Sequence, residues 1–306
     1  MSRPLKVGVQ LPEVERVIRW PELRAMARRI EAVGYDAIWL GDHLLYRWPG
    51  TPAARGPWEC WTMLAAIAAC TSRVTLGPLV ASTSFHAPAM LAKQAATVDE
   101  ISGGRLILGL GAGWNETEYS AFGFPFDHRI SRFEEAFTII RTLLREGAID
   151  FDGTYYQARD CELLPRPVRP GGPPLLLGSS GERMLRIAAP YIDGWNAWYN
   201  ATGNSPAGVA PLIEQVDEAA RAAGRAPATI ERSVAVLVRL AGGSGRLQGL
   251  DSGPVVPALA GSPEVMAEEL RAYARAGIDA VQLVLDPITL GSIEAFGSVL
   301  ELLDAD

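Results

Sequence analysis

"RVTLGPLVASTSFHAPAMLAKQAATVDEISGGRLILGL", residues 73–110, contains the repeating unit that decides the fold. Residues 73–80 are rich in Val, Leu and Thr and predict a strand, and residues 105–110 predict a second one. Between them, residues 88–101 predict a helix. A strand, a helix and another strand in this order predict a pair of parallel strands joined by a crossover helix.

The same alternation extends in both directions along the chain. Most of the expected strands are continuously apolar, as in a sheet that is covered on both faces. Eight strands and eight helices in strict alternation predict the α/β class and a (β/α)8 TIM barrel, in one domain over residues 1–306. A six-stranded doubly wound sheet with a small domain is the alternative. The other expected strands are 5–11, 36–40, 173–178, 194–198, 231–240 and 279–285, and the other expected helices are 21–34, 59–70, 129–146, 182–191, 206–224, 263–276 and 291–303.

Two insertions interrupt this rhythm. Residues 148–157, after the fourth helix, predict a hairpin with Asp152 and Gly153 at its turn. Residues 241–257, after the seventh strand, are rich in glycine and have no period, so they predict a loop. In a barrel this loop would emerge on the catalytic face, as a lid or as an idle connection.

The composition limits the classes of partner. The 306 residues carry a net charge of −7 without a basic run, which argues against nucleic acid or an anionic membrane as the partner. The chain begins without the apolar core of a signal peptide, and no run is long enough to span a membrane. Cys60, Cys70 and Cys161 are odd in number and lack CxxC spacing, so we expect reduced thiols in a cytoplasmic protein.

Histidine provides the candidate for proton transfer. In a (β/α)8 barrel the working face lies at the carboxyl ends of the strands, and Asp42 and His43 directly follow the second strand. His43 is therefore the predicted catalytic acid–base group, against the alternative that it only hydrogen-bonds the rim. His86 and His128 are expected to be structural. Scattered histidines without paired carboxylates predict no metal centre.

Two glycine-rich segments follow other strands. In "GLGAGWNE", residues 109–116, Gly109 is expected to relieve crowding inside the strand. Gly111 and Gly113 are instead expected to let the backbone approach a ligand. In "GSSGE", residues 178–182, Ser179 and Glu182 have the spacing of a capping box. This helix start predicts either a phosphate site or an ordinary cap.

The tryptophans fall into two groups. Trp39 lies within a predicted strand and is expected to pack in the core. The others considered are expected on or near the rim of the barrel, where they suit either a planar ring system or a plain apolar cleft. They are Trp48, Trp114, Trp195 and Trp198.

Three segments together resemble the luciferase-like monooxygenase superfamily. They are "GDH" at 41–43, "APAMLAKQAATVDEISGGRLILGLGAGWNETEYSAFGFPF" at 87–126 and "GSSGERMLRIAAPYIDGWNAW" at 178–198. Within the superfamily the chain is most similar to the branch of coenzyme F420-dependent oxidoreductases, and the resemblance covers nearly the whole chain. Its motifs are specific for the superfamily but far less so for F420 over FMN.

The resemblance implies a barrel that binds a reduced deazaflavin or flavin at its mouth and acts on a small organic substrate. It places His43 near the reactive edge of the ring, a non-prolyl cis peptide at Leu79-Val80, and the phosphate near Tyr119 and near the N–H groups of 178–181. Homodimers are common in the superfamily, so the resemblance also makes a homodimer an option. The cofactor-binding residues that it implies are Asp42, Leu79, Val80, Gly111, Ala112, Gly113, Trp114, Asn115, Tyr119, Gly178, Ser179, Ser180 and Gly181.

The chain departs from this pattern at Trp114. Sugar-phosphate dehydrogenases of the F420 branch have a glutamate there, and Glu116, two positions later, need not replace it. His43 is then the lone acid–base candidate. Three functions follow: hydride transfer with F420, oxygenation with reduced FMN as the alternative, or cofactor binding without turnover.

Overall fold

A computed structural model describes residues 3–47, 53–243 and 255–305. Its contacts group into two compact units, Met1–Trp39 with Gly178–Asp306 (unit 1) and Leu40–Leu177 (unit 2). Each unit is described by itself, and the single domain stays a prediction. Trp48 and most of the predicted loop 241–257 lie outside the described residues.

Unit 1 is built on parallel strands. They pair in the order β2, β1, β11, β10, β9, and β1 pairs on both sides, with Gly8 opposite Ala37 and Gln282. All of these strands lie where the apolar runs predict them. Their bounds are β1 (Lys6–Gln10), β2 (Ala37–Leu40), β9 (Gly194–Ala197), β10 (Glu231–Arg239) and β11 (Ala280–Asp286).

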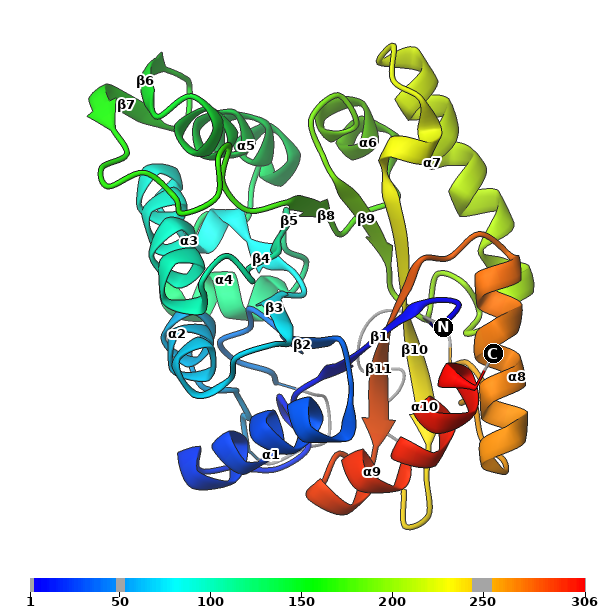
Figure 1. The fold of residues 1–306 in the computed structure, drawn as a ribbon. Coiled ribbons are helices and arrows are strands. Elements are labelled where there is room, and N and C mark those ends of the chain that lie inside the picture. The colour runs from blue at the N-terminus through cyan, green and yellow to red at the C-terminus, as the bar shows by residue number, and fades with distance from the viewer. Residues whose placement is uncertain (1–2, 48–52, 244–254, 306) are drawn as a thin grey trace. The chain divides into compact units, whose positions relative to one another are not determined.

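Helices cover these strands, and α7 and α8 run along the same side of β10 (Figure 1). Helix α1 has a proline in its first turn and ends at Gly34 with φ 105°, as its sequence predicts. The helix predicted at 291–303 is wrong in one respect, because it breaks at Phe296 into α9 and α10. The helices are α1 (Trp20–Val33), α6 (Glu182–Ala188), α7 (Ala210–Ala222), α8 (Pro263–Arg275), α9 (Leu290–Ala295) and α10 (Gly297–Asp304), with 3-10 turns η2 (Pro206–Gly208) and η3 (Pro227–Thr229).

The buried face of unit 1 has a polar layer near the start of its strands. The Asn196 amide donates to the Ser233 hydroxyl at 3.1 Å and to the Gln282 carbonyl oxygen at 2.7 Å. Ser233 donates in turn to the Trp195 carbonyl at 3.0 Å. All of these side chains are buried, and the donors and acceptors satisfy one another as buried polar groups must.

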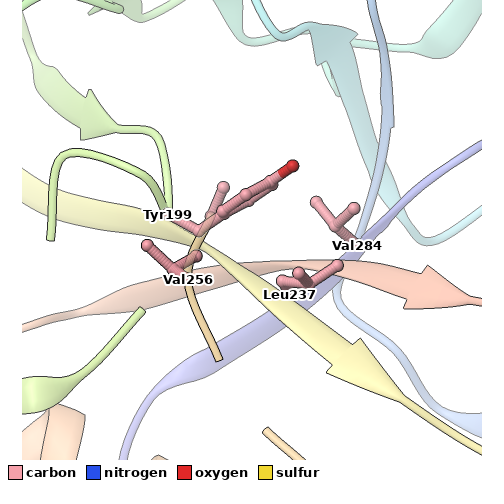
Figure 2. Close-up of a cluster of buried hydrophobic side chains, with 5 residues drawn as sticks. Tyr199, Leu237, Val256 and Val284 are labelled. Carbon is pink, nitrogen blue, oxygen red and sulfur yellow. The ribbon is translucent and has the colours of Figure 1, made fainter. Parts of the chain in front are cut away.

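An apolar cluster lies farther along the same strands. Tyr199, Leu237, Val256 and Val284 pack together with Ala235, as Figure 2 shows for the four labelled side chains. Ala235 and Leu237 follow Ser233 at intervals of two, and Val284 follows Gln282 in the same way. They therefore project from the same face of the sheet as the polar layer.

Unit 2 has a second set of parallel strands. β5 pairs with β4 on one side and with β8 on the other, and Leu76 of β3 bridges to Leu106 just before β5. An antiparallel hairpin of β6 and β7 lies beside α5. The elements are β3 (Thr75–Pro78), β4 (Ala81–Ser82), β5 (Leu108–Gly111), β6 (Ala148–Asp152), β7 (Gln157–Glu162), β8 (Leu175–Leu177), α2 (Cys60–Cys70), α3 (Pro88–Ser102), α4 (Glu116–Phe122), α5 (Arg129–Arg145) and the 3-10 turn η1 (Thr83–Phe85).

Strict alternation is the part of the sequence prediction that the structure corrects. The strand predicted at 73–80 corresponds to β3, and an additional short strand, β4, follows it. A cis peptide at Leu79-Val80, the bond that the family resemblance implies, lies between the two strands. Helix α4 is additional. The predicted hairpin exists, but four residues, 153–156, connect β6 and β7, so the second strand lies farther along the chain.

Arg105 joins the ends of two helices in unit 2. Its guanidinium donates five hydrogen bonds of 2.7–3.0 Å, four of them to carbonyl oxygens at or just beyond the ends of α2 and α3. The acceptors are Ala68, Thr71, Val74 and Ser102. Carbonyls at helix ends lack partners within the helix, and a cation satisfies them and opposes the helix dipole.

Candidate active site

His43 follows β2 and is held by a carboxylate from α4. Its Nδ1 lies 2.8 Å from Glu118 Oε1. Glu118 Oε2 accepts hydrogen bonds from the backbone N–H groups of Leu44 and Leu45. The His43 side chain is 19% exposed and that of Glu118 is 1% exposed, so the imidazole reaches the surface of unit 2 while the carboxylate does not.

The surroundings of Glu118 favour its ionised form. Burial alone would raise its pKa, but the hydrogen bond and positive charge of His43 and the two backbone N–H groups outweigh burial. The pKa of Glu118 therefore lies below its ordinary value. The sequence analysis identified no carboxylate partner for His43, and Glu118 is that partner in the structure.

Asp42, the neighbour of His43, makes a second pair in another direction. Its Oδ2 lies 2.8 Å from His86 Nε2 and accepts the Ser82 N–H at 2.9 Å. Asp42 is buried, and the His86 ring also meets the edge of Trp61, with 6.4 Å between ring centroids. His86 is thus held in place at the start of α3, in line with a structural role. Contact of Asp42 with a cofactor stays a prediction.

Aromatic rings surround the His43 imidazole. The ring centroid of Tyr46 lies 4.7 Å away and that of Trp114 lies 5.7 Å away, the latter edge-on. Tyr46 is buried, whereas Trp114 is 41% exposed. A titratable nitrogen beside an exposed indole is a setting that suits a planar ligand.

The loop after β5 is held by side chains of α4 and α5. The Tyr119 hydroxyl donates to the Ala112 carbonyl at 2.7 Å and lies 2.9 Å from Ser82 Oγ. Gly113 has φ 71°, and a Cβ there would lie 2.1 Å from the Tyr119 hydroxyl. Arg129 holds the Gly113 carbonyl at 2.7 Å. These contacts give a structural reason for a glycine at position 113, and ligand approach at Gly111 and Gly113 stays a prediction.

Tyr119 is itself fully buried, which bears on its predicted role. The structure places its hydroxyl under the loop. The predicted approach of Tyr119 to a phosphate stays a prediction.

Four further predicted residues, Asn115, Gly109, Leu79 and Val80, have different surroundings. The Asn115 amide donates to the Leu45 carbonyl at 3.0 Å, so it holds the segment that follows His43. Gly109 lies inside β5, where a Cβ would meet the Pro78 carbonyl oxygen at 2.3 Å, and crowding is confirmed as its reason. Leu79 is buried and Val80 is half-buried. Their contact with a cofactor stays a prediction.

Residues 178–181 belong to unit 1. Helix α6 begins at Glu182 with Gly181 as its N-cap, so the predicted capping box with Ser179 as N-cap is wrong. The Ser179 hydroxyl instead accepts the Gly181 N–H at 3.3 Å, and its carbonyl accepts the Trp195 indole N–H at 2.9 Å. Trp195 is fully buried, which corrects its predicted place on the rim. Ser180 is half-buried, and Gly178 to Gly181 stay predictions for a phosphate.

Trp39 and the three cysteines, which were also considered in the sequence, lie outside the site. Trp39 is buried, as predicted, and Cys60, Cys70 and Cys161 are free thiols. In residues 3–47, 53–243 and 255–305, no three His, Cys, Asp or Glu side chains are placed to hold a metal ion. Within the same ranges, no helix has the length and apolar character needed to cross a membrane.

Glu118 is the site residue that the sequence reasoning missed, although a signal was present. Asn115 and Glu118 stand three positions apart, as N-cap and N3 do in a capping box, so "NETE" predicts a helix start. The helix does begin there, but Asn115 makes no cap hydrogen bond with its side chain. Both side chains reach across to the segment 43–45 instead.

Comparison with known proteins finds similar relatives, among them a reductase and a monooxygenase. The chain is 30% identical over 191 residues to a 5,10-methylenetetrahydromethanopterin reductase of Archaeoglobus fulgidus, covering 62% of this chain and 52% of the relative. It is 38% identical over 172 residues to a pyrimidine monooxygenase of Methylobacterium radiotolerans, covering 55% and 44%. The aligned region thus spans about half the length of these relatives.

A solved structure shows the fold. An F420-dependent secondary alcohol dehydrogenase in complex with an F420-acetone adduct superposes with a TM-score of 0.82, covering 98% of this chain and 99% of that one at 21% identity. The predicted α/β barrel of the luciferase-like type is confirmed. The model of the luciferase-like monooxygenase family matches residues 5–244. The chain belongs to the luciferase-like monooxygenase family.

Proposed function

We propose that this protein is an F420-dependent oxidoreductase that transfers a hydride between the deazaflavin and a small organic substrate, with His43 as the group that exchanges the accompanying proton. The observation that carries the proposal is the His43 imidazole, which is partly exposed, held by Glu118 and flanked by Trp114. A general acid or base needs this combination of access and fixed orientation. Similarity to the F420-dependent alcohol dehydrogenase supports the choice of cofactor.

The residues present suit a flat, phosphorylated cofactor. The exposed face of Trp114 offers apolar contact to a planar ring, and the Gly111–Asn115 loop is held in one conformation by Tyr119 and Arg129. In the proposal, Gly178 to Gly181 bind the phosphate through backbone N–H groups and the serine hydroxyls. When bound, the cofactor supplies the hydride chemistry.

The protein's own residues orient the reactants and move the proton. His43 accepts or donates a proton at its imidazole, depending on the direction of the reaction. Asp42 fixes the start of the segment 42–45 through its bonds to His86 and Ser82. The chain thereby presents His43 in one place. The homodimer and the cytoplasmic location stay predictions.

A monooxygenase with reduced FMN is the second candidate. Similarity to the pyrimidine monooxygenase and the match to the family model favour it. In that case the same residues would exclude water from the reacting centre and hold the ring. A binding protein without turnover is the third candidate, and it needs the same site.

Cofactor titration tests the proposal. Binding is measured by fluorescence with F420 and with FMN, and each is compared with its form lacking the phosphate. We expect saturable binding of F420 and none of FMN; the reverse result contradicts the proposal and supports the monooxygenase.

Replacing Ser179 and Ser180 by Glu should weaken binding of the phosphorylated cofactor far more than binding of its dephosphorylated form. Equal losses would refute the phosphate site, and tight binding without oxidation in a substrate screen would leave the binding protein.

A further inference from the structure

We propose that Glu118 is a positioning residue: it keeps the proton of the neutral His43 ring on Nδ1 and so makes Nε2 the nitrogen that exchanges a proton with the substrate. Proton exchange between Nε2 and the substrate rests on the proposed function. The position of the proton on the His43 ring rests on the geometry of the pair with Glu118.

The tautomer follows from the chemistry of the pair. An ionised carboxylate only accepts hydrogen bonds, and Glu118 Oε1 lies 2.8 Å from His43 Nδ1. Nδ1 must therefore donate. A neutral imidazole carries one N–H, so Nε2 is then its basic nitrogen. Carboxylates that hold the far nitrogen of a histidine act in the same way in metal and hydrolase sites.

The carboxylate has no freedom to turn away. Its second oxygen accepts the backbone N–H groups of Leu44 and Leu45, and the Asn115 amide holds the Leu45 carbonyl at 3.0 Å. Helix α4 thus grips the segment after His43 through two side chains. The pKa of Glu118 lies below its ordinary value despite burial, which keeps the carboxylate ionised near neutral pH.

Within residues 3–47, 53–243 and 255–305, the titratable side chains considered beside Glu118 make other contacts. Asp42 directs its Oδ2 to His86 and to the Ser82 N–H, and Tyr46 contacts the His43 ring with its own ring. Glu116 and Arg47 line an open pocket of about 530 Å³ with Thr117, Ser120 and Ala121. Glu116 is therefore a matched control on the same helix as Glu118.

Nitrogen-15 NMR of the histidine side chains in the cofactor-free protein tests the tautomer directly. The chain has three histidines, and exposed His128 serves as an internal reference. We expect His43 to show protonated Nδ1 and to titrate above the ordinary value of about 6.5. In Glu118→Gln its pKa should fall by about 1 unit, whereas Glu116→Gln should leave it unchanged.

Protonated Nε2 in the neutral wild-type ring would overturn the proposal, as would an unchanged titration in Glu118→Gln. If that variant does not fold, the wild-type tautomer still decides. With turnover established, Glu118→Gln should lower kcat at least tenfold with little change in KM and move the pH profile, and Glu118→Asp should recover part of the loss. Because the NMR needs no cofactor, failure of F420 binding would refute the proposed function and leave the tautomer result standing.

Discussion

Each unit contains a buried polar cluster, and the two clusters differ in kind. In unit 1, Asn196, Ser233 and Gln282 form a neutral network across three neighbouring strands. In unit 2, the cluster that follows residue 41 contains the buried carboxylates of Asp42 and Glu118, each bonded to a histidine that is partly exposed.

This difference separates a cluster with a structural role from one that can take part in proton transfer. A neutral network satisfies its own donors and acceptors and does not respond to pH, so it can only fix the strands. A carboxylate–imidazole pair can change its proton content near neutral pH and is connected to the surface by its histidine. The structure therefore directs the search for chemistry to unit 2.

The largest expected effect comes from removing the imidazole at the surface of unit 2. His43→Gln should lower turnover by about 10²–10⁴-fold, because a general acid–base group contributes that much. Cofactor affinity should stay within a few-fold. Steady-state kinetics and cofactor titration measure the two quantities. His128→Gln is the control, since His128 is exposed, and equal activity of both variants would remove His43 from the chemistry.

A smaller effect tests how rigidly the site is supported. Gly113→Ala combines a φ of 71° with a Cβ 2.1 Å from the Tyr119 hydroxyl, whereas Gly123→Ala has φ 78° and nothing within 4 Å. We expect the free energy of unfolding to fall by about 2–4 kcal/mol in the first variant and by about 1 kcal/mol in the second. Urea denaturation measures both. Equal losses would mean that the loop yields freely and that Tyr119 does not support it.

The smallest expected effect is a difference in how the stability of two variants, one in each unit, depends on pH. Asn196→Ala should cost about 1–3 kcal/mol of unfolding free energy, with the same value at pH 5 and pH 8. Glu118 has a lowered pKa in the folded chain, so its contribution is present above the unfolded value of about 4.3 and is lost as the pH falls through the folded value. The cost of Glu118→Gln should therefore shrink towards pH 3. If the loss of unfolding free energy depended on pH in Asn196→Ala, or did not depend on pH in Glu118→Gln, the contrast between the neutral network and the carboxylate–imidazole pair would be wrong.

The order of strands and most helices could be predicted from the sequence, since apolar runs and helical periods are local signals. Helix α4 was missed because "ETEYSAF" is short and has no apolar period. The division at Leu79-Val80 came from the family resemblance and not from the pattern of residues. The N-cap of α6 was placed two residues early because serine is a stronger cap signal than the Gly181 that is used.

The site was only half predictable for a related reason. His43 follows a strand end, which is a position that sequence can read. Its partner lies 75 residues away, and only the fold of unit 2 brings α4 to the segment 43–45. Glu118 thus carried a local signal for a helix start but none for its target. Asp42 was identified by resemblance, while its bond to His86 again depends on two segments meeting in space.

Arg105 has a consequence for anyone who redesigns this protein. Its planar guanidinium bonds to five acceptors that lie in α2, in the residues 71–74 that follow α2, and at the end of α3. Lysine offers three donors from a single point and cannot reach the same set. Arg105 therefore links the ends of α2 and α3 through a single side chain. A mutagenesis library that keeps arginine at position 105 should contain more folded variants than a library that randomises this position.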